Sequence, residues 1–131
     1  MYKIEIKNYG FKLTFGGVLD KNELQKWINE SQALLKSTQD EFGVFVDMRT
    51  LHPLVRDAQM LMEEGQKEYK ERGMQRSVVI LDSAIMAMQF KRLAKDTGIY
   101  QWERYIDAST HNNWEELGVN WISDGIDPDR I

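Results

Sequence analysis

Two short apolar runs, separated by a stretch whose apolar residues have helical spacing, constrain the fold of this chain more than any other feature. Residues 43–48 and 77–81 are rich in valine, isoleucine, leucine and phenylalanine and are too short to form helices. Runs of this kind are typical of strands that are covered on both faces of a sheet. The amphipathic stretch between them is long enough for a crossover helix, so the two strands should lie parallel in one sheet.

The regions that flank these runs predict a hairpin, a last strand and about four helices. Polar and apolar residues alternate over 2–7 and 11–15 with turn residues between them, so an antiparallel hairpin should open the fold. Spacing and capping residues predict helices over about 21–36, from Pro53 to Gly73, from Ser83 to Gly98 and from Ser109 or Thr110 to Trp121, with a strand over 102–106. The order predicts one α/β domain over 1–123 with a mixed five-stranded sheet, followed by a loose C-terminal tail over 124–131.

Length and composition are those of one ordinary soluble domain. The chain has 131 residues, and its 17 basic and 21 acidic residues are interleaved, giving a net charge of -4. This pattern offers no basic patch to a nucleic acid, which is therefore not an expected partner. The chain has no cysteine, no apolar stretch of bilayer length and no signal-peptide core, so we expect no transmembrane segment and a cytoplasmic location.

The order of elements and several short motifs resemble those of STAS-like domains. The matching segments are the strand Val44–Arg49 followed by Leu51 and a helix, the strand Arg76–Leu81, and a final helix that ends Trp121-Ile122. STAS-like domains are the sulfate-transporter and anti-sigma-factor-antagonist class, which includes the SpoIIAA-like proteins of the STAS and CRAL-TRIO superfamily. The resemblance implies a SpoIIAA-like fold and a non-catalytic, bacterial, regulatory domain that binds a protein partner or forms a homodimer.

The switch that this resemblance implies is only partly present. STAS-like domains of this class carry a phosphorylatable serine just before the helix that follows the third strand. Asp47-Met48 matches the start of that motif, but its later positions fall at about Val55-Arg56-Asp57-Ala58, where no serine stands. A kinase-operated switch therefore does not carry over. Asp57 is either a fixed negative charge in place of a phosphate or an ordinary acid of a first helical turn.

A polar rim is expected where the carboxyl ends of the parallel strands meet the helix N-termini. The residues placed there are Asp47, Arg49, Thr50, His52, Asp82, Ser83, Asp107, Ser109 and His111. Such an edge often binds ligands, so it could hold an anion or receive a partner, whereas Asp82, Ser83 and Ser109 are also typical helix caps. Asp47 ends an apolar strand and would cost free energy if it were buried alone, so we expect a hydrogen-bonding partner such as Arg49.

The sequence carries no pattern that predicts catalysis, a metal or a cofactor. A serine, a histidine and an aspartate of the rim could be assembled into a hydrolytic triad, but no Gly-x-Ser-x-Gly elbow supports it. The two histidines lack the spacing of known metal sites. We therefore expect no enzyme activity, with convergent titratable groups around a cleft as the observation that would change this interpretation.

Two functional hypotheses remain, and the methionines separate them. Met60 and Met88 fall outside the apolar stripes of their helices, so their exposure would indicate a docking surface for a protein. A closed cavity lined by methionines would instead favour a carrier or sensor of a small anionic or lipid-like ligand. The candidate ligand- or partner-binding residues are Asp47, Arg49, Thr50, His52, Asp57, Asp82, Ser83 and Met60.

Overall fold

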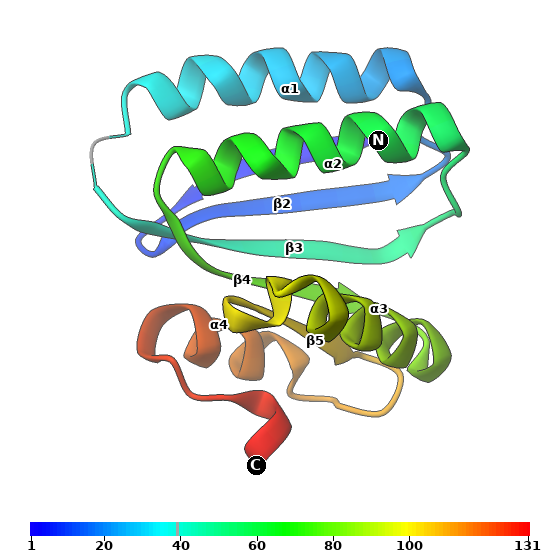
Figure 1. The fold of residues 1–131 in the computed structure, drawn as a ribbon, viewed down its shortest axis with the longest axis vertical. Helices are drawn as coiled ribbons and strands as arrows, with labels where there is room; N and C mark the ends of the chain where they lie inside the picture. The colour runs from blue at the N-terminus through cyan, green and yellow to red at the C-terminus, as the bar shows by residue number, and fades with distance from the viewer. Residues whose placement is uncertain (39) are drawn as a thin grey trace.

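One five-stranded sheet forms the centre of the molecule (Figure 1), which a computed structural model describes over residues 1–38 and 40–131. Its strands lie in sequence order and are β1 (Tyr2–Lys7), β2 (Gly10–Gly17), β3 (Phe42–Leu51), β4 (Met74–Leu81) and β5 (Glu103–Asp107). Strand β1 is antiparallel to β2, and the pairs β2–β3, β3–β4 and β4–β5 are parallel. The predicted α/β fold with an antiparallel hairpin and a parallel remainder is confirmed.

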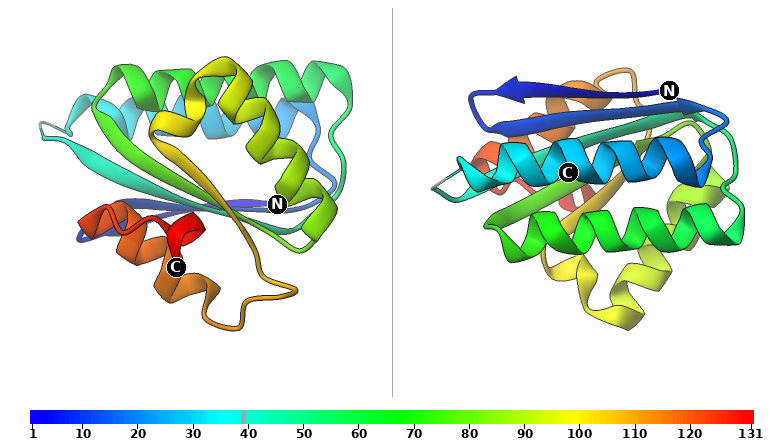
Figure 2. Two further views of the ribbon diagram at one scale, coloured as in Figure 1. Left: turned by 60° about the horizontal axis from the view of Figure 1, so that its bottom comes forward. Right: turned by 90° about the horizontal axis from the view of Figure 1, so that it is seen from above.

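The helices cover both faces of this sheet (Figure 2). Over the described residues they are α1 (Lys21–Lys36), α2 (Arg56–Glu71), α3 (Ala84–Thr97) and α4 (Trp114–Asp124), with short 3-10 helices η1 (Ile99–Gln101) and η2 (Pro128–Arg130). Helices α1, α2 and α3 lie on one face, and α4 lies on the other. None of the helices in the described part of the chain is long and apolar enough to cross a membrane.

The alternation of side chains along β3 explains why the sheet has a core on each face. Val44 and Val46 pack into the larger core, on the side of α1 and α2, whereas Phe45 packs into the smaller core beneath α4. In β4, Val79 packs into the larger core and Val78 into the smaller one. Because successive residues of a strand point to opposite faces, a continuous apolar run is required wherever both faces are covered.

Helices α1 and α2 pack closely because a glycine stands at their contact. Trp27 of α1 is fully buried and stacks on Tyr69 of α2, with 5.9 Å between the ring centres. The Tyr69 hydroxyl lies 2.7 Å from the Ser31 hydroxyl in a buried hydrogen bond. A Cβ atom on Gly65 would lie 2.2 Å from Cζ3 of Trp27, so only glycine allows this approach.

Two helices begin later than the sequence predicts. Helix α2 starts at Arg56 rather than at Pro53, with Val55 as its N-cap. Helix α4 starts at Trp114, after Asn113, instead of after Ser109 or Thr110. Helix α4 starts late because the hydroxyls of Ser109 and Thr110 donate to the Asp107 carboxylate and are used in the turn that follows β5.

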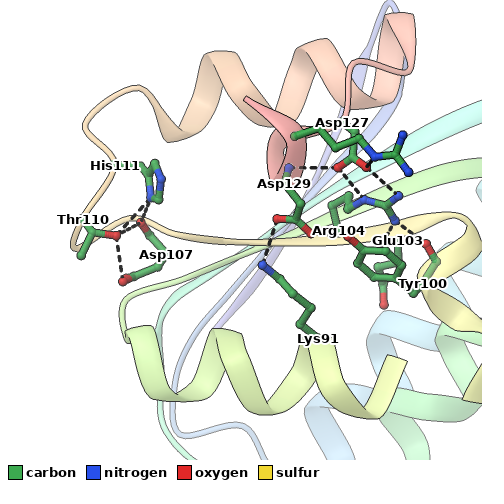
Figure 3. Close-up of polar contacts among 10 residues, drawn as sticks. Lys91, Tyr100, Glu103, Arg104, Asp107, Thr110, His111, Asp127 and Asp129 are labelled. Atoms are coloured by element: carbon green, nitrogen blue, oxygen red, sulfur yellow. Dashed lines mark hydrogen bonds and ion pairs between the residues drawn. The ribbon is translucent and has the colours of Figure 1, made fainter. Parts of the chain in front are cut away.

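The expectation of a loose C-terminal tail is wrong. The Asp127 carboxylate accepts from Nε of Arg104 at 2.9 Å and from Nη2 of Arg104 at 3.2 Å, and Asp129 pairs with Lys91 of α3 at 2.9 Å (Figure 3). Asp127 also caps η2 by accepting from the backbone N–H of Asp129. These contacts hold the tail against β5 and α3.

Candidate functional site

The clearest polar structure at the carboxyl end of the sheet is the ion pair of Asp47 and Arg49. The guanidinium donates through Nε to Oδ1 of Asp47 at 3.0 Å and through Nη2 to Oδ2 at 2.9 Å, and the Arg49 backbone N–H also donates to Oδ1 at 3.0 Å. The guanidinium carbon lies 4.0 Å from the centre of the Trp114 ring. The expected partner of Asp47 is thus confirmed, and the pair joins β3 to the first residue of α4.

Electrostatics around Arg49 favour a structural role over anion binding. The hydrogen bond to Asp47 is the largest cause of the raised pKa of Arg49, and the nearby charges of Asp47, Glu115 and Asp82 add to it. Those carboxylates would repel an incoming anion, and two guanidinium nitrogens are already bound to Asp47. The arrangement therefore fits a fold-fixing ion pair.

Asp47→Ala should lower stability more than Asp57→Ala. The first substitution removes three hydrogen bonds from a buried carboxylate and should cost about 1–3 kcal/mol, or roughly 3–12 °C in Tm. Asp57 lies exposed in the first turn of α2, where an acid contributes less than about 1 kcal/mol. Thermal unfolding followed by circular dichroism compares the two variants, and equal, negligible shifts would contradict the anchoring role of Asp47.

The other residues of the predicted rim do not converge on one site. Thr50, His52 and Asp82 are exposed. Ser83 is the N-cap of α3, where its hydroxyl accepts from the backbone N–H of Met86 at 3.2 Å, so the capping interpretation holds for this residue. Within residues 1–38 and 40–131, no group of three or more histidine or acidic side chains is placed to hold a metal ion.

Asp107 is engaged in the turn after β5. Its carboxylate accepts from the Ser109 hydroxyl at 2.6 Å. It also accepts from the Thr110 hydroxyl at 3.0 Å, and Nδ1 of His111 lies 3.1 Å from the Asp107 backbone oxygen (Figure 3). The hydrogen bond from Ser109 is the main reason that the pKa of Asp107 is lowered. Asp107, Ser109 and His111 therefore stabilise a local turn.

Two hollows are small for a ligand. One of about 20 Å³ lies between α2 and the sheet, lined by Gln66, Ser77, Glu103 and apolar neighbours, and its volume suits a single water molecule. The other is a groove of about 170 Å³ between the hairpin and α4, where Tyr9 and Lys12 lie among the lining residues. Pockets for organic ligands usually measure about 300–1,000 Å³.

A buried carboxyl borders the smaller hollow. Glu103 accepts hydrogen bonds from the Ser77 hydroxyl at 2.7 Å and from the Tyr105 hydroxyl at 2.5 Å. Burial is the main effect on this carboxyl and raises its pKa, although the two hydrogen bonds act in the opposite direction. Both donors are held within the β4–β5 pair, so this cluster belongs to the interior of the sheet.

The outer surface of α3 is apolar to an extent that the sequence did not reveal. Ile85, Met88 and Leu93 expose 68%, 60% and 60% of their surface, and Met86 is also exposed. We call these four side chains the α3 patch. The helix contributes only Ala87 and Ala94 to the fully buried core, although Met86, Phe90, Leu93 and Ala94 have the spacing of one apolar stripe. The signal in the sequence is that apolar residues stand on more than one side of this helix, so they cannot all face the core.

Helix α2 adds two exposed apolar side chains near its start, Val55 and Met60. Because α2 follows β3 and α3 follows β4, both helices begin at the carboxyl edge of neighbouring parallel strands (Figure 1). Met60 and Met88 are both exposed, and exposure of these two residues is what we expected of a docking surface for a protein. The candidate functional site is therefore a surface and not a cavity.

Comparison with known proteins supports the fold. No protein-family model and no curated protein matches this chain. A solved structure of an uncharacterised DUF3478-family protein from Shewanella loihica PV-4, described as having a SpoIIAA-like fold, matches with a TM-score of 0.59 at 17% sequence identity. The match covers 87% of this chain and 91% of that chain. At this identity the likeness shows the fold alone, and it confirms the SpoIIAA-like architecture that the sequence resemblance implied.

Proposed function

We propose that this chain is a non-catalytic protein-interaction domain of a regulatory kind, which binds a partner protein through the α3 patch. The exposure of Ile85, Met88 and Leu93 on one helix is the observation that carries the proposal. Single exposed apolar residues are normal on a protein surface, whereas a contiguous exposed apolar patch is typical of a protein-binding site. Methionine adds an adaptable contact because its side chain is unbranched and polarisable.

Charge on α3 specifies the kind of partner. The helix carries Lys91, Arg92 and Lys95 but only one acid, Asp96, in its last turn. Arg92 and Lys95 are exposed and follow Met88 at helical spacing (i+4 and i+7), so the α3 patch has a basic rim beside Met88. The matching surface on a partner is an apolar strip flanked by carboxylates, such as an acidic amphipathic helix.

A carrier function has weaker support. The two hollows are below the usual size for organic ligands, and six of the seven methionines of the chain, Met1, Met60, Met86 and Met88 among them, do not line either one. The smaller hollow has one methionine, Met74, in its wall. A protein surface accounts for the exposed methionines more directly than a cavity does.

Site-specific photo-crosslinking in cells of the protein's own host tests the proposal. A photoreactive amino acid at Met88 should crosslink to a defined protein, whereas the same group at exposed Asn29 on α1 should not. The double substitution Ile85→Glu/Leu93→Glu should leave the fold intact because both residues are exposed, and should weaken binding of the crosslinked partner by roughly 30-fold or more. Equal crosslinking from both positions, or unchanged affinity of the double variant, would contradict the proposal.

A further inference from the structure

Strand β1 leaves one long edge of the sheet without a neighbour among the described residues. It pairs with β2 on one side only and stands at the margin of the sheet (Figure 2). Its pairing with β2 is regular over all six residues, with no bulge. Natural edge strands are usually protected by bulges, prolines or charged side chains that oppose the addition of another strand. Of these, β1 has only charged side chains, those of Lys3, Glu5 and Lys7.

Hydrogen-bond geometry shows which backbone groups of β1 face outward. Met1 and Gly16 exchange both of their hydrogen bonds, at 2.7 and 2.9 Å. Bonded and non-bonded pairs alternate along an antiparallel ladder, so odd-numbered residues of β1 bond to β2. The N–H and C=O groups of Tyr2, Ile4 and Ile6 therefore point away from the sheet. They form a row of donors and acceptors that a further strand can use.

Side chains along β1 separate by face. Tyr2 and Ile4 pack toward the core beneath α1, and Ile6 follows on the same face with an exposed fraction of 72%. Lys3, Glu5 and Lys7 share the opposite face, where Nζ of Lys3 lies 3.6 Å from Oε1 of Glu5. The strand therefore presents an apolar row on one face and a plus-minus-plus row on the other.

This pattern is complementary to itself in one antiparallel register. When Ile4 lies opposite Ile4 of a second copy, Lys3 lies opposite Glu5 of that copy, and Glu5 lies opposite its Lys3. The same register places Ile6 opposite Tyr2, so the exposed isoleucine gains an aromatic cross-strand neighbour. All three outward-facing residues of each strand then fall in hydrogen-bonded pairs.

Neighbouring registers are less favourable both in charge pairing and in the number of hydrogen-bonded pairs. A shift of two residues in one direction sets Lys3 against Lys3, and a shift in the other sets Lys3 against Lys7 and Glu5 against Glu5. Each of these shifts also removes one of the hydrogen-bonded pairs at the ends. Like charges directly opposite each other destabilise a sheet, so the charges of β1 disfavour both of these neighbouring registers.

We infer that β1 is a self-association edge, through which a second copy of this chain adds in antiparallel orientation with Ile4 on the twofold axis. The two sheets join into one continuous sheet, with α1 of both copies on the same face. This interface is separate from the α3 patch, which lies over the other end of the sheet near β5. It therefore does not depend on the proposed partner protein.

Charge exchange across the twofold axis tests this inference. We expect the wild-type chain to be a dimer in analytical ultracentrifugation, and Glu5→Lys and Lys3→Glu each to weaken dimerisation by about tenfold or more, because each sets like charges opposite each other twice. The double variant Lys3→Glu/Glu5→Lys should restore the dimer. A mixture of the two single variants should form heterodimers, because both cross-strand pairs between positions 3 and 5 are then opposite in charge.

The fold of the variants and the position of the dimer interface are checked separately. Circular dichroism should show wild-type structure in each variant, since these side chains lie on the surface. Amide hydrogen exchange of the wild type should show that the Ile4 and Ile6 N–H groups become more protected as concentration rises. A wild-type chain that stays monomeric at high micromolar concentration overturns the inference, and so does a dimer that the single variants leave unchanged. The Ile85→Glu/Leu93→Glu variant should remain dimeric, which distinguishes this interface from the α3 patch.

Discussion

Replacing Asp127 by alanine should lower the free energy of unfolding by about 3–5 kcal/mol, because it leaves a buried guanidinium without its counter-ion. Arg104 is 7% exposed and donates two hydrogen bonds to Asp127 and two to backbone carbonyl groups, those of Tyr100 and Glu103. Its guanidinium also lies between the rings of Tyr100 and Trp121. Urea denaturation of wild type and variant measures the difference.

Two further variants separate loss of the ion pair from loss of the tail. Asp124→Ala removes an exposed acid from the end of α4 and should change stability by less than about 0.5 kcal/mol. The double substitution Arg104→Met/Asp127→Leu replaces both charges by apolar groups and should be less destabilising than Asp127→Ala alone. If Asp127→Ala were no worse than Asp124→Ala, the tail would not be anchored through Arg104.

The contribution of this ion pair should disappear in acid. The hydrogen bond from Arg104 is the largest cause of the lowered pKa of Asp127. A carboxyl whose pKa is lower in the folded state releases its proton more readily there, so its stabilising effect is complete above the unfolded value of about 3.9. That effect is lost as pH falls through the folded pKa. The stability difference between wild type and Asp127→Ala should therefore be largest near neutral pH and should shrink below about pH 4.

Elements that depend on local signals were predicted well from the sequence. The apolar runs over 43–48 and 77–81 lie in β3 and β4, and α1 has the bounds that Asp20 as N-cap and the spacing of Leu24 and Trp27 indicate. These signals are local because strand period, helix period and capping act over a few residues. The partnership of Asp47 with Arg49 was predictable for the same reason, since the two residues are adjacent on one face of a strand.

Features that depend on contacts distant in sequence could not be predicted. Arg104 and Asp127 are 23 positions apart, and nothing in the tail indicates that its acids meet a buried cation. The exposure of Met86 and Leu93 depends on how α3 lies against β5, which its own spacing does not determine. The polar rim was placed at the correct edge, but Asp47, Ser83 and Asp107 each have a nearer partner. Thr50, His52 and Asp82 are exposed, so no common site formed.

Gly65→Ala should lower the free energy of unfolding by about 2 kcal/mol even though alanine is the better helix former. The new Cβ would lie 2.2 and 2.5 Å from two ring atoms of Trp27 and 3.2 Å from Cγ1 of Ile28. Trp27 is fully buried between Phe15 and Tyr69, so its ring cannot move aside without disturbing the core. Overpacking of this kind typically costs about 1–3 kcal/mol, which outweighs the gain of about 1 kcal/mol in helix propensity.

A double-mutant cycle shows whether the Trp27 ring is the cause. Trp27→Phe should destabilise the wild-type background by leaving a cavity, but should cost less in the Gly65→Ala background, where the added methyl group occupies part of that space. Glu64→Ala on the exposed side of the same turn serves as control and should change stability by less than about 0.5 kcal/mol. Strictly additive effects of the two core substitutions would show that α1 and α2 approach each other less closely than the Gly65–Trp27 contact requires. A coupling of 1 kcal/mol or more, an order-of-magnitude expectation for residues in contact, would place the close approach of these helices at this glycine.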